Sequence, residues 1–174
     1  MEKCISISII GAGTWGISIA DLLSKNGYSV DLFHYNKETV RLIKESNNVK
    51  NLNLQLSPLI NILEISSFEK KDYDYVFIAI PCQYIKDVLS QIKINDKSIV
   101  VSLSKGISMD SLQYPRGIIS KIIGIDKDDI VLLSGPSHAE ELIAELPTAL
   151  VSSSKKRSNA VKIQELVSNH FFRV

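Results

Sequence analysis

Three glycines, Gly11, Gly13 and Gly16, stand where an apolar run ends and a helical pattern begins, in the stretch IIGAGTWGISIADLLSKNG at residues 9–27. The β-branched residues before the glycines predict a strand, and the apolar spacing after them predicts an amphipathic helix. A second strand is expected at residues 28–35. A strand, a GxGxxG turn, a helix and a second strand within about 30 residues form the fingerprint of a dinucleotide-binding fold. This feature restricts the start of the chain to a βαβ unit.

Each glycine of the turn has a physical role in the dinucleotide interpretation. Gly11 permits the tight turn, Gly13 lets the backbone approach a pyrophosphate, and Gly16 allows the helix to pack closely on the strand. Unpaired amides and the positive end of the helix that begins near Thr14 would balance the charge of the pyrophosphate. The alternative is a glycine turn that serves packing only. The first interpretation predicts NAD or NADP as the cofactor.

The end of the second strand carries the residues that would meet the adenosine ribose. NAD-preferring folds place an acidic residue there, whereas this chain has His34, Tyr35, Asn36 and Lys37. A neutral or basic edge tolerates a 2′-phosphate, so NADP suits it at least as well as NAD. His34 and Tyr35 are candidate cofactor-binding residues that would stack on the adenosine or bond to it, or they could serve packing alone.

Strands and helices alternate along the rest of the chain. The expected strands are residues 60–67, 74–80, 97–104, 129–134 and 148–154. The expected helices are residues 36–46, with Asn36 as its cap, 83–92, 112–124, entered near Pro115, 137–146 and 158–170. Residues 47–59 are expected to form an irregular crossing, and the final FFRV to begin another strand. Alternation favours a parallel sheet with helices on both faces. We therefore expect an α/β fold, a Rossmann-like, doubly wound, mostly parallel sheet, in one dinucleotide-binding domain over residues 1–174.

The composition argues against several classes of partner. The chain has 20 basic and 19 acidic residues with neither sign concentrated, so we expect no nucleic-acid partner and no anionic membrane surface. No apolar stretch approaches the roughly 20 residues that cross a bilayer, and no cleavage-site pattern follows the N-terminus, so a cytoplasmic protein is expected. Cys4 and Cys82 lack CxxC spacing and are expected to be buried rather than bound to a metal. The expected partner is a small molecule.

Four short stretches together resemble one family. They are IGAGTWG at 10–16, SKG at 104–106, SGPSHAEEL at 134–142 and LPTAL at 146–150. In this order and at these distances they resemble the signatures of the N-terminal domain of bacterial-type NAD(P)-dependent glycerol-3-phosphate dehydrogenase, and the resemblance covers essentially the whole chain. It implies a whole enzyme that interconverts sn-glycerol 3-phosphate and dihydroxyacetone phosphate and feeds phospholipid synthesis.

The resemblance also implies roles for individual residues. It implies cofactor contacts from Thr14, Trp15, Tyr35 and Ala139, a contact of Lys105 with both cofactor and substrate, and substrate contacts from Gly135 and Ser137. Two positions depart from the family pattern, since His138 stands where the family has phenylalanine and Phe33 where it commonly has tryptophan. Both departures concern the neighbourhood of the cofactor rather than the glycine turn.

The residues themselves favour some of these roles and leave others open. Lys105 and Gly135 lie just past the ends of expected buried strands, where ligands bind in open parallel sheets. Lys105 could meet a phosphate or a developing alkoxide, or it could be a solvated cation on a loop. Ser137, at the head of an expected helix, could be an N-cap with or without a substrate. Glu140 and Glu141 in the first helical turn are explained by the helix dipole alone.

One catalytic group is absent from the matched region. Oxidation of an alcohol by hydride transfer needs a group that takes the hydroxyl proton, and the resemblance implies that the family's lysine for this role lies on a downstream helical domain. Lys105 is therefore the catalytic-site candidate within this chain, and we expect dinucleotide binding with very poor turnover. Another dehydrogenase, of hydroxy acids or ketopantoate, and a non-catalytic dinucleotide-binding module remain as alternatives. The final FFRV is expected to leave apolar surface for a missing domain, which would favour a homodimer.

Overall fold

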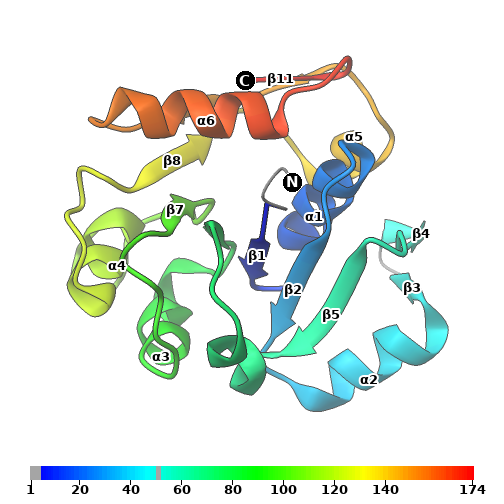
Figure 1. Cartoon of the computed structure of the whole chain (residues 1–174), viewed down its shortest axis with the longest axis horizontal. Coiled ribbons are helices and arrows are strands. Elements are labelled where there is room, and N and C mark those ends of the chain that lie inside the picture. The colour runs from blue at the N-terminus through cyan, green and yellow to red at the C-terminus, as the bar shows by residue number, and fades with distance from the viewer. Residues whose placement is uncertain (1–4, 50–51) are drawn as a thin grey trace.

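The computed structural model describes residues 5–49 and 52–174, and its centre is a seven-stranded sheet (Figure 1). The strands are ordered β10-β8-β7-β6-β1-β2-β5 along the sheet. Neighbouring strands pair in parallel, except that β10 runs antiparallel to β8. The strands are β1 (Ile7–Ile10), β2 (Val30–His34), β5 (Ile60–Glu64), β6 (Tyr75–Ile78), β7 (Ile99–Ser102), β8 (Val131–Ser134) and β10 (Val151–Ser153). The expected mostly parallel α/β sheet is confirmed.

Helices and short turns connect these strands. The helices are α1 (Thr14–Lys25), α2 (Lys37–Ser46), α3 (Ile85–Leu89), α4 (Pro115–Ile123), α5 (Ala139–Ile143) and α6 (Arg157–Val167), with 3-10 turns η2 (Ile65–Lys70) and η3 (Cys82–Tyr84). Two small ladders lie outside the main sheet, one of β3 (Asn48–Val49) and β4 (Leu54–Gln55), the other of β9 (Thr148–Ala149) and β11 (Phe172–Arg173). The crossing expected to be irregular at 47–59 therefore contains a short antiparallel ladder, and its residues 50 and 51 lie outside the described residues.

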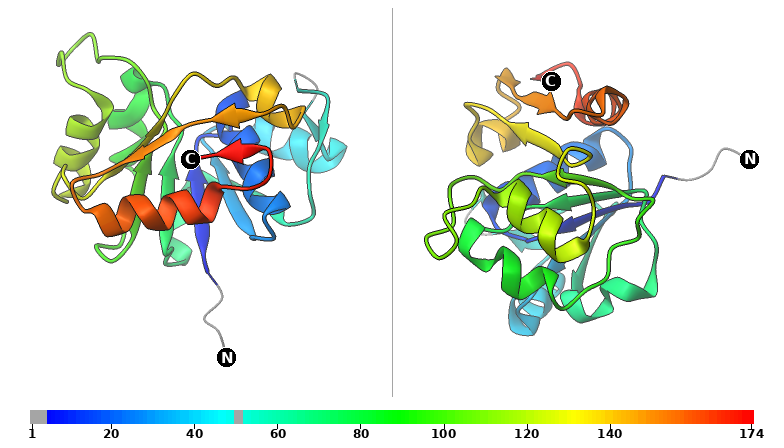
Figure 2. Two further views of the ribbon diagram at one scale, coloured as in Figure 1. Left: turned by 90° about the horizontal axis from the view of Figure 1, so that it is seen from above. Right: turned by 90° about the vertical axis from the view of Figure 1, so that its left-hand side faces the viewer.

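The main sheet separates two hydrophobic clusters, because successive side chains of a strand point to opposite faces. In β6, Phe77 packs into one cluster, and Val76 and Ile78 pack into the other. The first cluster includes side chains of α1, α5 and α6, and the second includes those of α3 and α4. Figure 2 shows α6 on one side of the sheet and α3 with α4 on the other. The doubly wound arrangement with helices on both faces is thereby confirmed.

The chain leaves the central strand β1 in two directions. It runs first through β2 to β5 at one edge, then returns to pair β6 with the other side of β1 and continues to β7 and β8. The connections after β1 and β6 therefore leave neighbouring strand ends toward opposite faces, which opens a crevice between them. The glycine turn that follows β1 lies at this crevice.

Local capping residues decide where the helices begin and end. Asn36, expected as the cap of α2, accepts a hydrogen bond from the amide of Thr39 at 2.9 Å. The helix expected at 83–92 begins as the 3-10 turn η3 and continues as α3 only to Leu89. The helix expected at 112–124 starts at Pro115 and ends before Gly124, which has a φ of 75°. The entry near Pro115 is as expected, whereas apolar periodicity overestimated the helix at 83–92, because caps and turns rather than core-facing spacing terminate a helix.

Residues 148–154, expected as one strand, form two short ones. The amides of Thr148 and Leu150 donate to the carbonyls of Phe171 and Arg173, each at 2.9 Å, so β9 pairs with the last strand of the chain. Beyond Leu150 the chain turns to pair with β8 instead. The strand is divided because its two halves find hydrogen-bond partners in different sheets.

The expectation that the final FFRV leaves apolar surface is wrong. Phe172 is 0% exposed, and Phe171 is also buried, both in the cluster that includes α1 and α6. The pairing of β11 with β9 places this end of the chain against the domain's own core. Large apolar side chains are exposed instead on the loop after β7, at Ile107, Met109, Leu112 and Tyr114. The homodimer stays a prediction, without support from FFRV.

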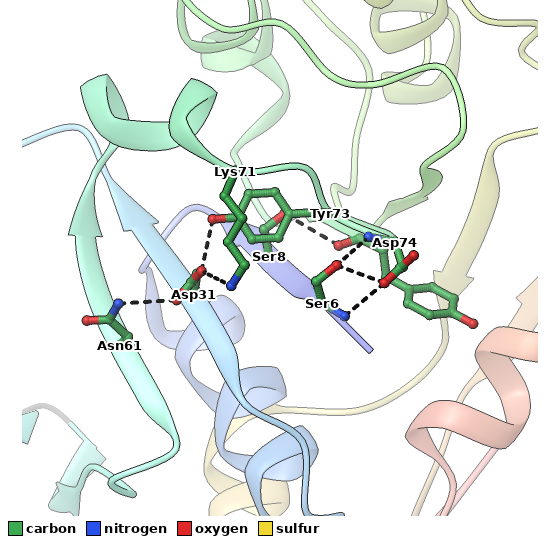
Figure 3. Close-up of polar contacts among 8 residues, drawn as sticks. Ser6, Ser8, Asp31, Asn61, Lys71, Tyr73 and Asp74 are labelled. Atoms are coloured by element: carbon green, nitrogen blue, oxygen red, sulfur yellow. Dashed lines mark hydrogen bonds and ion pairs between the residues drawn. The ribbon is translucent and has the colours of Figure 1, made fainter. Parts of the chain in front are cut away.

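Polar contacts tie together the amino ends of the central strands, at the edge of the sheet opposite the crevice (Figure 3). Asp31 of β2 accepts hydrogen bonds from the Tyr73 hydroxyl and the Lys71 ammonium, each at 2.9 Å. Asp74 accepts from the amide and the hydroxyl of Ser6, at 3.0 and 2.8 Å. Burial and the neighbouring Asp31 raise the pKa of Tyr73, so its hydroxyl keeps the proton that it donates. These contacts hold β1 and β2 to the segment that enters β6.

Phe172→Ala tests the packing of the chain end. The substitution is expected to lower the free energy of unfolding by about 3–5 kcal/mol, because it removes a fully buried ring and leaves a cavity. Met109→Ala, at a side chain that is 86% exposed, is the matched control and should change that free energy by less than about 0.5 kcal/mol. Urea denaturation followed by circular dichroism measures both. Equal effects of the two substitutions would contradict the buried position of Phe172.

Candidate functional site

A cleft of about 1040 Å³ opens at the carboxyl ends of β1, β2, β6 and β7. Every residue that the sequence predicted for the site lines it, with the exception of Gly135. The predicted residues that the fold brings together there are Gly11, Gly13, Thr14, Trp15, Gly16, His34, Tyr35, Lys105, Ser137 and Ala139. They come from four separate parts of the chain, which meet because parallel strands end at one edge of the sheet.

Two of the glycines in the turn are required by the protein's own packing. Gly11 has a φ of 112°, and its amide donates to the carbonyl of Phe33 at 2.9 Å. A Cβ at Gly11 would overlap the carbonyl of Ala79, and a Cβ at Gly16 would overlap the carbonyl oxygen of Gly11. The first turn of α1 therefore packs directly on the turn that follows β1, as the sequence predicted for a third glycine in this motif.

Gly13 is a different case. Its backbone is extended, with φ −75° and ψ 176°, a conformation that any residue adopts. A Cβ built at Gly13 would meet no atom within 4 Å and would project into open space beside the cleft. Within the described residues, neither the backbone conformation nor a neighbouring atom requires glycine at this position. The space that a side chain would fill is the space in which a ligand could approach the backbone.

The amino terminus of α1 presents unpaired donors to the cleft. The amides of Thr14, Trp15 and Gly16 have no hydrogen-bond partner within the part of the chain that the structure describes, and the first paired amide is that of Ile17, 2.9 Å from the carbonyl of Gly13. No side chain caps this terminus, and its first turn has no acidic residue. Three free amides at the positive end of a twelve-residue helix form a site suited to an anion.

His34 and Tyr35 form the rim of the cleft at the end of β2. Their rings stack on each other, 4.8 Å apart between centroids and tilted by 21°. His34 Nδ1 accepts a hydrogen bond from the amide of Asn36 at 3.0 Å. Burial lowers the pKa of His34, and a weaker contact with the Asn36 backbone opposes that shift. The imidazole is therefore favoured in its neutral form, and Tyr35, 72% exposed, leaves one ring face open to the cleft.

The strand beside β2 adds a carboxylate that sequence reasoning missed. Glu64, the last residue of β5, pairs in register with His34. Its Oε2 lies 3.4 Å from Nζ of Lys37, so the two side chains form an exposed ion pair. The absence of an acidic residue at the end of β2 itself is as the sequence predicted. The neighbouring Glu64 could be found only from strand order, because it lies far from this window in sequence.

Lys105 reaches the cleft from the loop after β7. Ser104, the residue before it, donates from its hydroxyl to the carbonyl of Ile80 at 2.6 Å, which fixes this loop to the end of β6. The Lys105 ammonium lies 5.6 Å from the centre of the Trp15 ring. Among the described residues no carboxylate forms an ion pair with Lys105. The ammonium is therefore available to an anion in the cleft.

Ser137 is not the N-cap that its position in sequence suggested. Its hydroxyl donates to the carbonyl of Ala149 at 2.9 Å, and the residue is 3% exposed. The helix α5 begins after His138, whose amide donates to the carboxylate of Glu141 at 3.2 Å. Ser137 is drawn away from the helix because β9 passes beside it. Its role in substrate contact stays a prediction.

Gly135 lies outside the wall of the cleft. A Cβ at this position would lie 2.9 Å from a methyl carbon of Leu150 and 3.1 Å from the carbonyl oxygen of Ala149. The missing side chain allows the segment between β9 and β10 to approach the end of β8. Packing therefore explains this glycine, and its predicted contact with substrate stays a prediction.

The segment after β6 forms a wall of the cleft that the sequence analysis did not identify. Pro81, Cys82, Gln83 and Tyr84 all line it. Cys82 is a free, buried cysteine, as expected, and burial raises the pKa of its thiol; Cys4 lies outside the described residues. The signal was available, because a strand ending at Pro81 beside the first strand of a doubly wound sheet must border the crevice.

Two kinds of site are absent from the described residues. In residues 5–49 and 52–174, no group of three or more histidine, cysteine, aspartate or glutamate side chains is arranged to hold a metal ion. Across the same described ranges, none of the helices combines the length and apolar character needed to traverse a bilayer.

The topology, the cleft and the glycine turn define a Rossmann-like α/β domain. Residues 6–160 match a family model described as the N-terminus of NAD-dependent glycerol-3-phosphate dehydrogenase, and the chain belongs to this family. A glycerol-3-phosphate dehydrogenase (NAD(P)+) of Bacillus subtilis (strain 168) is 36% identical over 177 residues, which cover 97% of this chain and 50% of the relative.

Solved structures share the fold. The crystal structure of glycerol-3-phosphate dehydrogenase from Coxiella burnetii aligns with a TM-score of 0.86 and 24% identity, covering 99% of this chain and 54% of that one. A pyrroline-5-carboxylate reductase from Coxiella burnetii aligns with a TM-score of 0.64 and 17% identity, covering 99% of this chain and 60% of that one. The chain spans about half the length of the relatives that it matches, for example 51% of one from Clostridium botulinum.

Gly16→Ala and Gly13→Ala are expected to differ in their effect on stability. Gly16→Ala should lower the free energy of unfolding by about 1–3 kcal/mol, because the new methyl group overlaps a backbone carbonyl that cannot move independently. Gly13→Ala should change it by less than about 1 kcal/mol, since the backbone there suits alanine and the methyl group enters open space. Chemical denaturation of the two variants measures this difference. A Gly16→Ala protein as stable as the wild type would contradict the close packing of α1 on the glycine turn.

Proposed function

We propose that this chain is the dinucleotide-binding domain of a glycerol-3-phosphate dehydrogenase, which interconverts sn-glycerol 3-phosphate and dihydroxyacetone phosphate. The observation that carries the proposal is Gly13, a glycine with an ordinary backbone conformation and empty space where its side chain would be. A ligand that approaches the backbone at this point explains the glycine, whereas packing within the protein does not. Membership of the family supports the identity of the reaction.

The residues of the cleft fit a nicotinamide dinucleotide. In this proposal the amides of Thr14, Trp15 and Gly16 bind its diphosphate at the positive end of α1. Tyr35 offers an exposed ring face to the adenosine. Ala139 lines the cleft from the side of α5, and its carbonyl lies 3.3 Å from the Ser18 hydroxyl, which also donates to the carbonyl of Thr14 at 2.8 Å. When bound, the nicotinamide supplies or accepts the hydride of the reaction.

The rim at β2 bears on the choice between NAD and NADP. His34, Tyr35 and Asn36 carry no negative charge, and Lys37 is exposed beside them. Glu64, at the end of the neighbouring strand, could repel a 2′-phosphate, but its carboxylate is paired with the Lys37 ammonium. We therefore propose that the rim accepts a 2′-phosphate, so that NADP binds at least as tightly as NAD.

Three residues are proposed to meet the substrate. The free ammonium of Lys105 attracts the phosphate of a phosphorylated substrate and favours negative charge that develops on a reacting oxygen. The oxygen of Ser137 already donates its proton to Ala149, so toward a ligand it acts as an acceptor. Gly135 would contribute through its backbone. Removal of the alcohol proton requires a general base, and we propose that it is the lysine that the family resemblance assigns to a downstream helical domain.

The sequence motifs favour glycerol 3-phosphate over other substrates of the same fold. A reductase that acts on a pyrroline carboxylate has a similar fold, so the fold alone does not identify the substrate. The stretch from Ser134 to Leu142 follows β8 and borders the cleft at Ser137, His138 and Ala139. The family resemblance implies substrate contacts from Lys105, Gly135 and Ser137, which is why we propose the same substrate here.

Titration of the 174-residue chain with NADPH and NADH tests cofactor binding. Nicotinamide fluorescence should show saturable binding, and Gly13→Val should weaken it at least about tenfold, because the side chain fills the space next to the free amides. Gly117→Ala is the matched control, since a Cβ at Gly117 also meets open space but lies in α4, away from the cleft. It should leave the affinity unchanged. Absence of binding by the wild type, or equal binding by Gly13→Val, would sink the proposed function.

Steady-state assays with dihydroxyacetone phosphate and NADPH test the catalytic part of the proposal. The 174 residues are expected to turn over far more slowly than the roughly 1–10³ s⁻¹ of ordinary enzymes, because they supply one side of the substrate site and no proposed general base. Oxidation of NADPH by ketopantoate or a keto acid in place of dihydroxyacetone phosphate would identify a different dehydrogenase. Turnover within the ordinary range would contradict the assignment of the proton-transfer group to another part of the enzyme.

A further inference from the structure

Trp15 and Lys105 come from opposite sides of the crevice and meet at its mouth. Trp15 is in the first turn of α1 and follows β1, and Lys105 follows β7 on the other side of β6. The ammonium lies 5.6 Å from the centre of the indole ring, within the range of a cation–π contact. Within the described residues no other contact of the Lys105 ammonium is found, whereas the lysines at positions 25 and 71 each also bind a carboxylate.

We propose that Trp15 is a positioning residue for Lys105. The face of the indole ring holds the ammonium beside the free amides of α1, so that a phosphate group in the cleft meets helix terminus and cation together. The proposal rests on the proposed function, because it states for which chemical group Lys105 is held: a phosphate, either of the dinucleotide or of a phosphorylated substrate. It goes beyond the proposed function because it assigns to the Trp15 side chain the role of orienting the Lys105 ammonium.

The need for such a device follows from the nature of lysine. Its ammonium is a point charge on a flexible stem of four carbons, and holding it in one place costs conformational entropy. Here the backbone of the loop is already fixed, since the Ser104 hydroxyl donates to Ile80 and the Leu103 amide donates to Ile78 at 2.9 Å. The side chain of Lys105 remains to be ordered, and within the described residues the Trp15 ring is the partner given for its ammonium, which forms no hydrogen bond or ion pair.

A second, independent observation concerns the indole nitrogen. Trp15 packs against the first hydrophobic cluster, and its Nε1 is buried without a hydrogen-bond partner within the described residues. An unpaired buried N–H is unfavourable, so apolar packing alone would favour phenylalanine at this position. Tryptophan is, however, the best aromatic face for a cation. The contact with Lys105 therefore explains why position 15 carries tryptophan, although its indole N–H is unpaired.

The first test needs no ligand. Trp15 is the only tryptophan of the chain, so Lys105→Met should change the tryptophan emission of the folded protein. In NMR spectra the ε-methylene protons of Lys105 should be shifted upfield by the ring current of Trp15. Trp15→Leu should abolish the shift and Trp15→Phe should retain part of it. Unshifted protons in the wild type, or emission that is the same in Lys105→Met, would overturn the proposal even if the dinucleotide binds.

The second test is a double-mutant cycle on the affinity of the chain for NADPH. Lys105→Met should weaken binding about tenfold if the ammonium meets a phosphate of the dinucleotide. Trp15→Leu should weaken it roughly two- to fivefold, the usual strength of an exposed cation–π contact. In the Lys105→Met background Trp15→Leu should have no further effect, because the group it positions is gone. The same loss in both backgrounds would mean that Trp15 acts by its own contact with the ligand, and the proposal would fall.

The arms of the cycle distinguish the two sources of phosphate. If Lys105→Met leaves the affinity for NADPH unchanged, the cycle is repeated by adding glycerol 3-phosphate to the NADPH complex. Lys105→Met and Trp15→Leu should then each weaken the binding of glycerol 3-phosphate. If neither substitution weakens it, the positioning role is refuted. Lys71→Met is the matched control, because its ammonium lies 5.2 Å from the Tyr73 ring at the opposite edge of the sheet. It should change neither affinity. A wild type that binds no dinucleotide but shows the ring-current shift would refute the proposed function and leave the Trp15–Lys105 contact standing.

Discussion

The contact of Gly16 with the carbonyl of Gly11 is the constraint on which the site depends. Because no side chain separates them, the first turn of α1 lies directly on the turn that follows β1. This closeness fixes the positive end of α1 at the switch point of the sheet, where the connections of β1 and β6 diverge. The free amides face the cleft as a consequence of packing. The close packing of α1 on the turn after β1 thus forms both the candidate anion site and part of the core of the domain.

The polar groups at the amino ends of the parallel strands are paired differently from those at the carboxyl ends. At the amino ends of the strands, polar side chains are paired with one another, as Asp31 is with Tyr73 and Lys71, and Asp74 with Ser6. At the carboxyl ends, the amides at the start of α1 and the ammonium of Lys105 form no hydrogen bond or ion pair within the described residues. A satisfied edge stabilises the fold, and an unsatisfied edge can bind. The proposed function follows from where the unpaired groups gather.

The contacts of the candidate site residues Lys105 and Ser137 depend on neighbours that are remote in sequence. In sequence Lys105 is an ordinary polar residue of a loop, but the fold places the Trp15 ring of α1 5.6 Å from its ammonium. The position of Ser137 in sequence suggests a helix cap, but in the fold its hydroxyl donates a hydrogen bond to the carbonyl of Ala149 in β9. Relatives of about twice the length show that domains of this kind occur as part of a larger protein. The loop after β7 that carries Lys105 also exposes the apolar side chains of Met109 and Leu112.

The sequence by itself determined the βαβ unit, the alternation that makes a doubly wound sheet, and the residues of the glycine turn, because these depend on periodicity and on local backbone sterics. It also placed Lys105 just past the end of a strand and identified Asn36 as a helix cap, because both follow from positions at the ends of elements. Only the tertiary structure decided that Phe172 is buried, that residues 148–154 divide between two sheets, and that Glu64 stands beside His34. Each of these depends on which distant strand supplies the hydrogen-bond partner or the covering side chain, and a local pattern holds no record of that choice.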